Sequence, residues 1–416
     1  MRALKSVASV FAERNILVMG ISAIFLNIAM PLYGTFLPLY FESLGVSIAL
    51  FGGISSILAA ARASIQVVGG HGADIYGRKT LIVTGGLVYA AALFPLFWVN
   101  SWYIAVLLLI ITQLGIMLYQ PGAQAMVSES VSAKKRATGF ATFYFILGIG
   151  GLIAPVLGGY ISLGGNYRFL FLIASLILFS VALSRLMFLE ETKVEGQLPS
   201  NVAESRRNRL GFAEKIKLTW NSSTSTRVYI VFSLLSGISF NIAGMYYLFF
   251  YQKVIGMNEL QIGISSTVFS VCMAITQIPG GMLSDKMGRK PLILMGLIVG
   301  PLTTLAMTQA NAFYHIIIIE AISGCTVGLE SASSMTLPTE LVDKEYRATA
   351  LGVFRAIDQA AAVIGPALGG LLVSYYAFEI YPKYVFYASI LAGIPSTILF
   401  AVLIKETLQK EVSKKP

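Results

Sequence analysis

Long apolar runs separated by short polar stretches dominate the chain. Runs such as 103–118 and 313–324 show no alternation of apolar and polar positions, so they do not suit the strands of a membrane β-barrel. Helices satisfy their backbone polar groups within one segment, as lipid demands. The pattern predicts twelve membrane-spanning helices, over residues 15–42, 47–72, 80–99, 102–127, 137–163, 166–189, 227–252, 260–284, 291–310, 313–337, 348–376 and 384–404.

The twelve segments form two groups of six, separated by the polar stretch 190–226. This stretch is rich in charge, too long for a hairpin, and without an apolar face to bury, so we expect a linker. The predicted organisation is a six-helix bundle at 1–189, a cytoplasmic linker at 190–226, and a second six-helix bundle at 227–416 that ends in a short cytoplasmic tail.

The two groups repeat one another at an offset of 211 residues. Because each repeat contains six spans, both halves have the same orientation in the membrane, and an axis along the membrane normal should relate them. The predicted fold class is therefore an all-α membrane protein made of two six-helix bundles. Gln66, Gly70, Asp74, Gly77, Arg78, Glu129, Arg136 and Pro155 recur as Gln277, Gly281, Asp285, Gly288, Arg289, Glu340, Arg347 and Pro366.

Composition supports this assignment. Of 416 residues, 56% are hydrophobic and only 12% are charged, about half the usual charged fraction of a soluble domain. The chain has only two cysteines and two histidines, all far apart in sequence, so neither a disulfide framework nor a zinc site is expected. We expect no cofactor, no metal and no enzymatic activity.

The basic residues follow the topology. With twelve spans, almost all of them fall on the side of the termini and the central linker, which predicts that both termini are cytoplasmic. Only Arg168, Lys253 and Lys383 fall on the other side, while Arg62 and Arg355 lie inside spans. The net charge of +10 is spread over short loops, so no nucleic-acid partner is expected.

Two loops carry a repeated motif, "GHGADIYGRK" at 70–79 and "GMLSDKMGRK" at 281–290. Together with the duplicated six-span pattern, these loops resemble the double signature of the major facilitator superfamily. The resemblance covers nearly the whole chain and implies secondary transport by alternating access. One departure is visible, since the basic residue that usually follows the aspartate is Ile75 in the first copy and Lys286 in the second.

The repeated charges and glycines are predicted to form a cytoplasmic gate. Glycines permit close approach of backbones, and an aspartate at a helix end can pair with a cation. The alternative is that these charges only set topology, although topology requires no repeated acidic residues. The predicted gate residues are Gly70, Asp74, Gly77, Arg78, Glu129, Arg136, Gly281, Asp285, Gly288, Arg289, Glu340 and Arg347.

Placing an ionisable side chain inside a membrane span costs free energy, so such residues indicate functional sites by default. Five such residues are expected to form intramembrane ion pairs or to couple transport to protons: Arg62, Glu320, Glu330, Arg355 and Asp358. Three acids against two bases leave one carboxylate unpaired, and Glu330 is the predicted proton carrier. An ion pair of Arg62 with Asp358, at similar predicted depth, is also expected. The alternative is a purely structural network.

Amides inside spans predict a polar central cavity, lined by Asn27, Gln113, Gln120 and Asn241. The first span and the run "GIGGLIAPVLGG" at 148–159 resemble drug:proton antiporters, although Asn27 replaces a common acidic residue. By contrast, "EETK" at 190–193 resembles sugar porters.

The aromatic residues at 246–251 are expected to form an interfacial belt.

The predicted function is secondary transport of one small organic solute by a monomer in the plasma (inner) membrane. The first hypothesis is efflux of a drug or hydrophobic metabolite in exchange for protons. The alternative is proton-linked uptake of a sugar or organic anion, with Arg62 or Arg355 holding the anionic group. A non-transporting sensor or a membrane-embedded enzyme is the third hypothesis, but no soluble output domain and no convergent catalytic residues support it.

Overall fold

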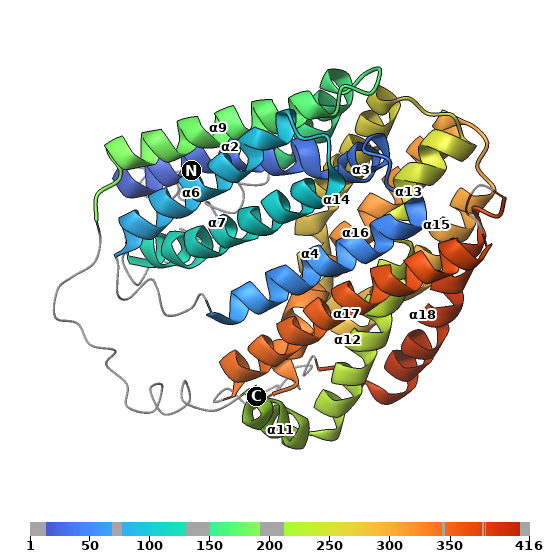
Figure 1. Cartoon of the computed structure of the whole chain (residues 1–416). Helices are drawn as coiled ribbons and strands as arrows, with labels where there is room; N and C mark the ends of the chain where they lie inside the picture. The colour runs from blue at the N-terminus through green and yellow to red at the C-terminus, as the bar shows by residue number, and fades with distance from the viewer. Residues whose placement is uncertain are drawn as a thin grey trace. The chain divides into compact units, whose positions relative to one another are not determined.

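The computed structural model describes residues 14–68, 77–129, 150–191, 212–342, 346–376, 378 and 380–407. Over these ranges the chain is helical and contains no strand (Figure 1). Ten of the described helices are long and apolar enough to cross a membrane, so the chain is an integral membrane protein. Two shorter apolar helices, Ile48–Ser64 and Gly150–Ile161, lie where the second and fifth spans were predicted. The total of twelve spans and the cytoplasmic termini stay predictions.

The helices of the described ranges are numbered along the chain. In chain order they are α2 (Arg14–Gly34), α3 (Leu37–Ser43), α4 (Ile48–Val68), α6 (Arg78–Leu93), η2 (Phe94–Phe97), α7 (Trp102–Glu129), α9 (Arg168–Phe188), α11 (Phe212–Ser222), α12 (Thr224–Ala243), α13 (Tyr246–Phe249), η4 (Phe250–Val254), α14 (Glu259–Met287), α15 (Arg289–Thr308), α16 (Phe313–Glu340), α17 (Arg347–Tyr376) and α18 (Tyr384–Leu403).

The chain divides into two compact units. The first unit comprises Met1–Gln197 together with Leu248–Thr267, and the second comprises Leu198–Tyr247 together with Val268–Pro416. The division between Gln197 and Leu198 falls inside the stretch predicted as a linker. The segment Leu248–Thr267 counts with the first unit although it belongs to the second sequence repeat.

In the first unit, α6 packs against both α7 and α9, and α2 packs against α9 (Figure 1). The crossing of α6 and α7 is close because glycines face each other there: a methyl group on Gly115 would lie 2.7 Å from the carbonyl oxygen of Gly85. The hydroxyl groups of Tyr33 and Tyr89 hydrogen-bond at 2.8 Å, which satisfies two buried polar groups inside the bundle.

In the second unit, α12 packs against α17 and α18, while α15 packs against α16 and α18. An aromatic cluster fills the interior, with ring centroids 5.0 Å apart for Tyr229 and Phe354 and 4.7 Å apart for Phe232 and Phe400. All four side chains are buried, so they hold the helices around the polar residues of the site described below.

Two predicted spans are interrupted in the structure. The first span ends as α2 at Gly34 and resumes as α3, which has Pro38 at its start, because proline favours the first turn of a new helix. The seventh span ends as α12 at Ala243 and continues through α13 into the π-helical turn η4. Apolar periodicity alone does not detect such breaks, since the residues stay apolar across them.

The linker prediction missed one helix. Residues 190–226 were expected to lack an apolar face, but α11 forms within them and packs against α12 and α17. Ser223 then caps α12, accepting a hydrogen bond from the Thr226 backbone N–H at 3.0 Å. The helix is amphipathic and rich in charge, so its mean hydropathy is low. A search for long apolar runs therefore does not detect it.

The aromatic residues at 246–251 do not form the expected interfacial belt. Tyr246 and Phe250 are fully buried, and Phe249 and Tyr251 are nearly so. These side chains therefore pack inside the protein, and the prediction from their position near a span end was wrong. Aromatic side chains at a span end can face either the interface or the interior, and sequence position does not distinguish the two.

Candidate transport site

A cavity of about 340 Å³ lies within the second unit, among α12, α15, α16 and α17. Its walls combine aromatic and aliphatic groups with hydroxyls, one amide and two carboxylates, the mixture typical of small-molecule sites. The lining residues are Tyr229, Phe232, Ser233, Ser236, Gly237, Phe240, Asn241, Ile293, Leu297, Glu330, Ser334 and Asp358.

The two carboxylates differ in their surroundings. Asp358 on α17 accepts a hydrogen bond from the Ser233 hydroxyl of α12 at 2.7 Å. Glu330 on α16 is half-buried, and no hydrogen bond or ion pair to it is found among the described residues. Its carboxylate occupies the space beside Gly296 of α15, where any side chain would collide with it. Glycine at this position therefore leaves room for Glu330.

Among the residues that the structure describes, no basic side chain lines the cavity. Arg355 lies one turn before Asp358 on α17 but is exposed and not part of the lining. Asn241 does line it, and its amide N–H donates to the Gly237 carbonyl of the same helix at 2.8 Å, which leaves the amide oxygen available. Glu320, three turns before Glu330, is half-buried outside the cavity.

In the first unit, the Arg62 Nε donates a hydrogen bond to Gln113 Oε1 at 3.1 Å, joining α4 to α7. Asn27 is half-buried on α2, and Gln120 is exposed on α7. The assignment of these amides to a cavity stays a prediction. The expected pair of Arg62 with Asp358 would involve both units and stays a prediction too.

Arg185 on α9 is an intramembrane charge that sequence reasoning missed. Its side chain is 1% exposed, its Nε donates to the Ser22 hydroxyl at 2.8 Å, and its guanidinium lies 4.8 Å from the centroid of the Tyr119 ring. Neither Nη1 nor Nη2 has a hydrogen-bond partner among the described residues. A basic residue this near a span end had been counted as cytoplasmic, and only tertiary structure shows its burial.

The second motif copy forms a charge cluster. Arg289 Nη1 lies 3.2 Å from Asp285 Oδ1, and Arg289 Nη2 lies 3.1 Å from Glu340 Oε1, so one guanidinium joins α14, α15 and α16. The Thr407 hydroxyl donates to the other oxygen of Glu340. Arg347 begins α17, and its Nε is buried without a partner among the described residues. Gly281 lies close to Ala332, as a small residue permits.

Each motif copy also receives a carboxylate from the end of its half. Glu406, just after α18, accepts hydrogen bonds from the Arg289 and Lys290 backbone N–H groups at 3.0 Å each. Glu191, just after α9, accepts them from Arg78 and Lys79 at 2.9 and 3.1 Å. Both carboxylates therefore cap the N-terminus of the helix that follows the motif.

The glycine before each capped helix has a positive φ, +89° at Gly77 and +100° at Gly288, and a side chain there would collide with the capping glutamate. Glycine is therefore required for both the turn and the cap. Among the other gate residues, Gly70, Asp74 and Arg136 lie outside the described residues. Glu129 ends α7, and its side chain is likewise outside the description.

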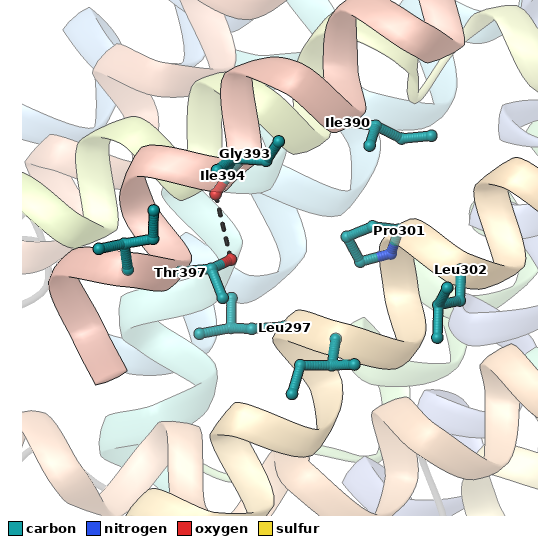
Figure 2. Close-up of a pocket in the computed structure, with 9 residues that line it drawn as sticks. Leu297, Pro301, Leu302, Ile390, Gly393, Ile394 and Thr397 are labelled. Atoms are coloured by element: carbon teal, nitrogen blue, oxygen red, sulfur yellow. Dashed lines mark hydrogen bonds between the residues drawn. The ribbon is translucent and has the colours of Figure 1, made fainter. Parts of the chain in front are cut away.

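A second hollow lies between α15 and α18 and holds about 220 Å³ (Figure 2). Its lining is apolar, and Leu302 and Ile398 on its walls are each 57% exposed. The one hydroxyl in it, that of Thr397, donates to the Gly393 carbonyl of its own helix at 3.1 Å. The described lining of this groove therefore offers little to orient a polar solute.

A polar cluster in the first unit anchors the segment Leu248–Thr267. Lys253 pairs with Glu42 at 2.5 Å, and the Tyr167 hydroxyl donates to Glu259 Oε1 at 2.9 Å. Tyr167 and Glu259 are both buried. Beside them, the main chain at Gly159 approaches that of Glu259 so closely that a methyl group would not fit. Segments far apart in sequence are thus joined by both polar and close backbone contacts.

Long apolar helices and a duplicated sequence define a polytopic membrane protein, and a cavity with two carboxylates lies in its second unit. The sequence profile of the Major Facilitator Superfamily matches residues 17–265 and, in a second match, residues 230–416. The chain therefore belongs to the Major Facilitator Superfamily and is a transporter of that family, which confirms the resemblance of its two loops.

Relatives span nearly the whole chain. An uncharacterized MFS-type transporter of Methanocaldococcus jannaschii is 26% identical over 403 residues, covering 94% of this chain and 95% of its own. The multi-drug resistance efflux pump PmrA homolog of Lactococcus lactis subsp. lactis is 24% identical over 375 residues, which cover 88% of this chain and 90% of the relative. The crystal structure of a mutant of the nucleoside transporter NupG has a TM-score of 0.76 at 17% identity, covering 94% of this chain and all of that one, which shows the shared fold alone.

Proposed function

We propose that the protein exports a small organic cation in exchange for protons, and that the cavity of the second unit binds both. The observation that carries this proposal is the pair Glu330 and Asp358 in a cavity that has aromatic walls and no basic side chain among its described lining residues. Carboxylates and aromatic faces attract cations, whereas an anionic substrate would meet two like charges. A relative that is named as a multi-drug resistance efflux pump supports export.

Exchange follows from competition for the same group. Glu330 has room beside Gly296 and no ion-pair partner among the described residues, so it can hold either a proton or the ammonium group of a substrate. Binding of one then requires release of the other, which couples their movements in opposite directions. Asp358, already hydrogen-bonded to Ser233, would orient the substrate.

The repeated cytoplasmic charges act as latches in this proposal. The contacts of Arg289 with Asp285 and Glu340 support such a role, since one guanidinium holds three helices and can release them. Asp74, Arg78, Glu129 and Arg136 would form the equivalent latch in the first half, and Arg347 would join the latch in the second. The plasma membrane is the proposed location, and a monomer the proposed functional state.

Purified protein in liposomes with an internal pH dye tests the proposal. We expect lipophilic amines to cause proton movement under an imposed pH gradient, while sugars and dicarboxylates cause none. Proton movement with a sugar or a dicarboxylate, and none with any amine, would favour the alternative of proton-linked uptake, with Arg62 or Arg355 binding an anionic substrate. Amine movement without proton movement would contradict the exchange.

A further inference from the structure

The two cysteines of the chain meet in the structure. Cys272 lies on α14 and Cys325 on α16, and both are half-buried free thiols in the second unit. The side chains of the two cysteines lie within interaction range of one another. Their distance in sequence suggested no relation, and the transport site does not use either of them.

Small residues cause this contact. At Gly324 the backbone of α16 approaches the carbonyl of Phe269 so closely that a methyl group would not fit, and that methyl would lie 3.1 Å from Cys272 Cβ. One turn later, Gly328 packs in the same way against Met273 and Thr276. A disulfide requires Cβ atoms roughly 3.5–4.5 Å apart, and small residues such as Gly324 and Gly328 allow two helices to approach closely enough for such a bond.

A hydrogen bond fixes the register of the two helices. The Thr276 hydroxyl donates to the main-chain carbonyl of Cys325 at 3.1 Å. Thr276 Oγ1 also lies 2.8 Å from the carbonyl oxygen of Cys272 in its own helix, so the one hydroxyl proton is shared between the main-chain carbonyls of both cysteines. One side chain of α14 therefore holds the main chains at Cys272 and Cys325 close together.

We propose that Cys272 and Cys325 form a reversible disulfide that joins α14 to α16 when the membrane contains organic hydroperoxides. One thiol sulfur attacks the peroxide, the O–O bond breaks, and the thiol proton leaves with the alkoxide as an alcohol, which gives a sulfenic acid. The second thiol attacks that sulfur, the S–O bond breaks, and its proton leaves with hydroxide as water. Two electrons pass from the thiols to the peroxide.

The disulfide slows transport, and this consequence rests on the proposed function. Glu330 follows Cys325 by five residues on the same helix, so a covalent link at Cys325 fixes the part of α16 that precedes the cavity carboxylate. Any movement of α16 past α14 during the transport cycle would then be prevented. Formation of the disulfide itself does not depend on what the protein carries.

Full-length protein in lipid nanodiscs tests the bond directly. After treatment with cumene hydroperoxide, the protein is denatured with N-ethylmaleimide and its intact mass is measured. We expect the monomer to carry no maleimide and to have lost two hydrogen atoms, while protein reduced afterwards with dithiothreitol carries two maleimides. Two maleimides after oxidation, or conversion to sulfinic acid in place of the bond, would overturn the proposal.

A displaced cysteine provides the matched control. Cys325→Ser combined with Thr326→Cys keeps two thiols but turns one away from α14, so it should retain both maleimides after the same treatment. In liposomes, oxidation should slow amine-driven proton movement several-fold in the parent protein and not in Cys272→Ser, with recovery on reduction. A cross-linked protein with unchanged transport would overturn the regulatory role, whereas a reduced protein that moves no substrate would contradict the proposed function instead.

Discussion

Glu330 lies against a glycine, and this neighbour decides how much room its carboxylate has. We expect Gly296→Ala to displace the carboxylate from the cavity and to reduce transport several-fold, because the added methyl group would occupy the position of Glu330 Oε2. Gly300→Ala is the matched control on the same helix, since a methyl group there meets nothing within 4 Å. Initial rates in liposomes at equal protein abundance measure both, and equal rates would contradict the steric argument.

A second expectation concerns the proton itself. Glu330→Gln keeps the size of the side chain but removes the titrating group, so the cationic substrate should bind more weakly and the remaining transport should no longer respond to an imposed pH gradient. Glu320→Gln, on the same helix but outside the cavity, should keep the response. Substrate-driven alkalinisation, followed with a pH dye, separates the two variants. A normal pH response in Glu330→Gln would assign the proton to Asp358 or to another group.

Site residues could be predicted from the sequence where a charged side chain interrupts an apolar run. Glu330 and Asp358 stand out in this way, and the structure places both in one cavity. Arg185 did not stand out, because it lies one turn from the end of its span and only its contacts with Ser22 and Tyr119 show that it is buried. The Cys272 and Cys325 contact was equally hidden, since it depends on how closely two helices approach.

At the scale of helices, the two capped N-termini are the feature with the clearest energetic consequence. Glu406→Gln leaves one acceptor for two backbone N–H groups of α15 and removes a negative charge from a helix N-terminus. We expect a loss of about 1 kcal/mol in the free energy of unfolding, the usual worth of such a cap. The midpoint of thermal unfolding in detergent micelles measures the loss.

The neighbouring exposed Lys405 provides the control for this cap. Lys405→Gln changes a charge at the same chain end without touching the N-terminus of α15, so its unfolding midpoint should match that of the parent protein. If Glu406→Gln and Lys405→Gln unfold at the same temperature, the carboxylate contributes nothing to α15.

The helices themselves were largely predictable because apolar length determines them, whereas their caps were not. Glu191 and Glu406 are 215 residues apart, four more than the 211-residue offset of the repeat, so comparison at one offset does not align them. Both precede a threonine, as "ET" in each case, and a search that allowed a small insertion between the halves would have found the pair. Breaks such as that after Gly34 leave no mark on hydropathy and could not be predicted.

At the scale of the whole molecule, the sequence repeat and the compact units do not coincide. The segment Leu248–Thr267 belongs to the second repeat but packs within the first unit, partly through Tyr167 and Glu259. We expect Tyr167→Phe to destabilise the protein by about 1–3 kcal/mol, because a buried carboxylate loses its hydrogen-bond donor. Tyr160→Phe is the control, since that side chain is 68% exposed. Equal thermal midpoints for both variants would show that the contact is unimportant.

The burial of Arg185 also has a consequence for the insertion of α9 into the membrane during synthesis. An arginine costs roughly 2.5–3.5 kcal/mol at the centre of a membrane-spanning helix when the translocon releases the helix into lipid, and less near the helix end, where Arg185 lies. The groups that Arg185 meets, Ser22 of α2 and Tyr119 of α7, belong to helices that leave the ribosome earlier. α9 therefore enters a bilayer that already holds its partners, and its insertion depends on helices synthesised before it. The order of the helices along the chain is thus part of what allows a buried guanidinium to exist in this protein.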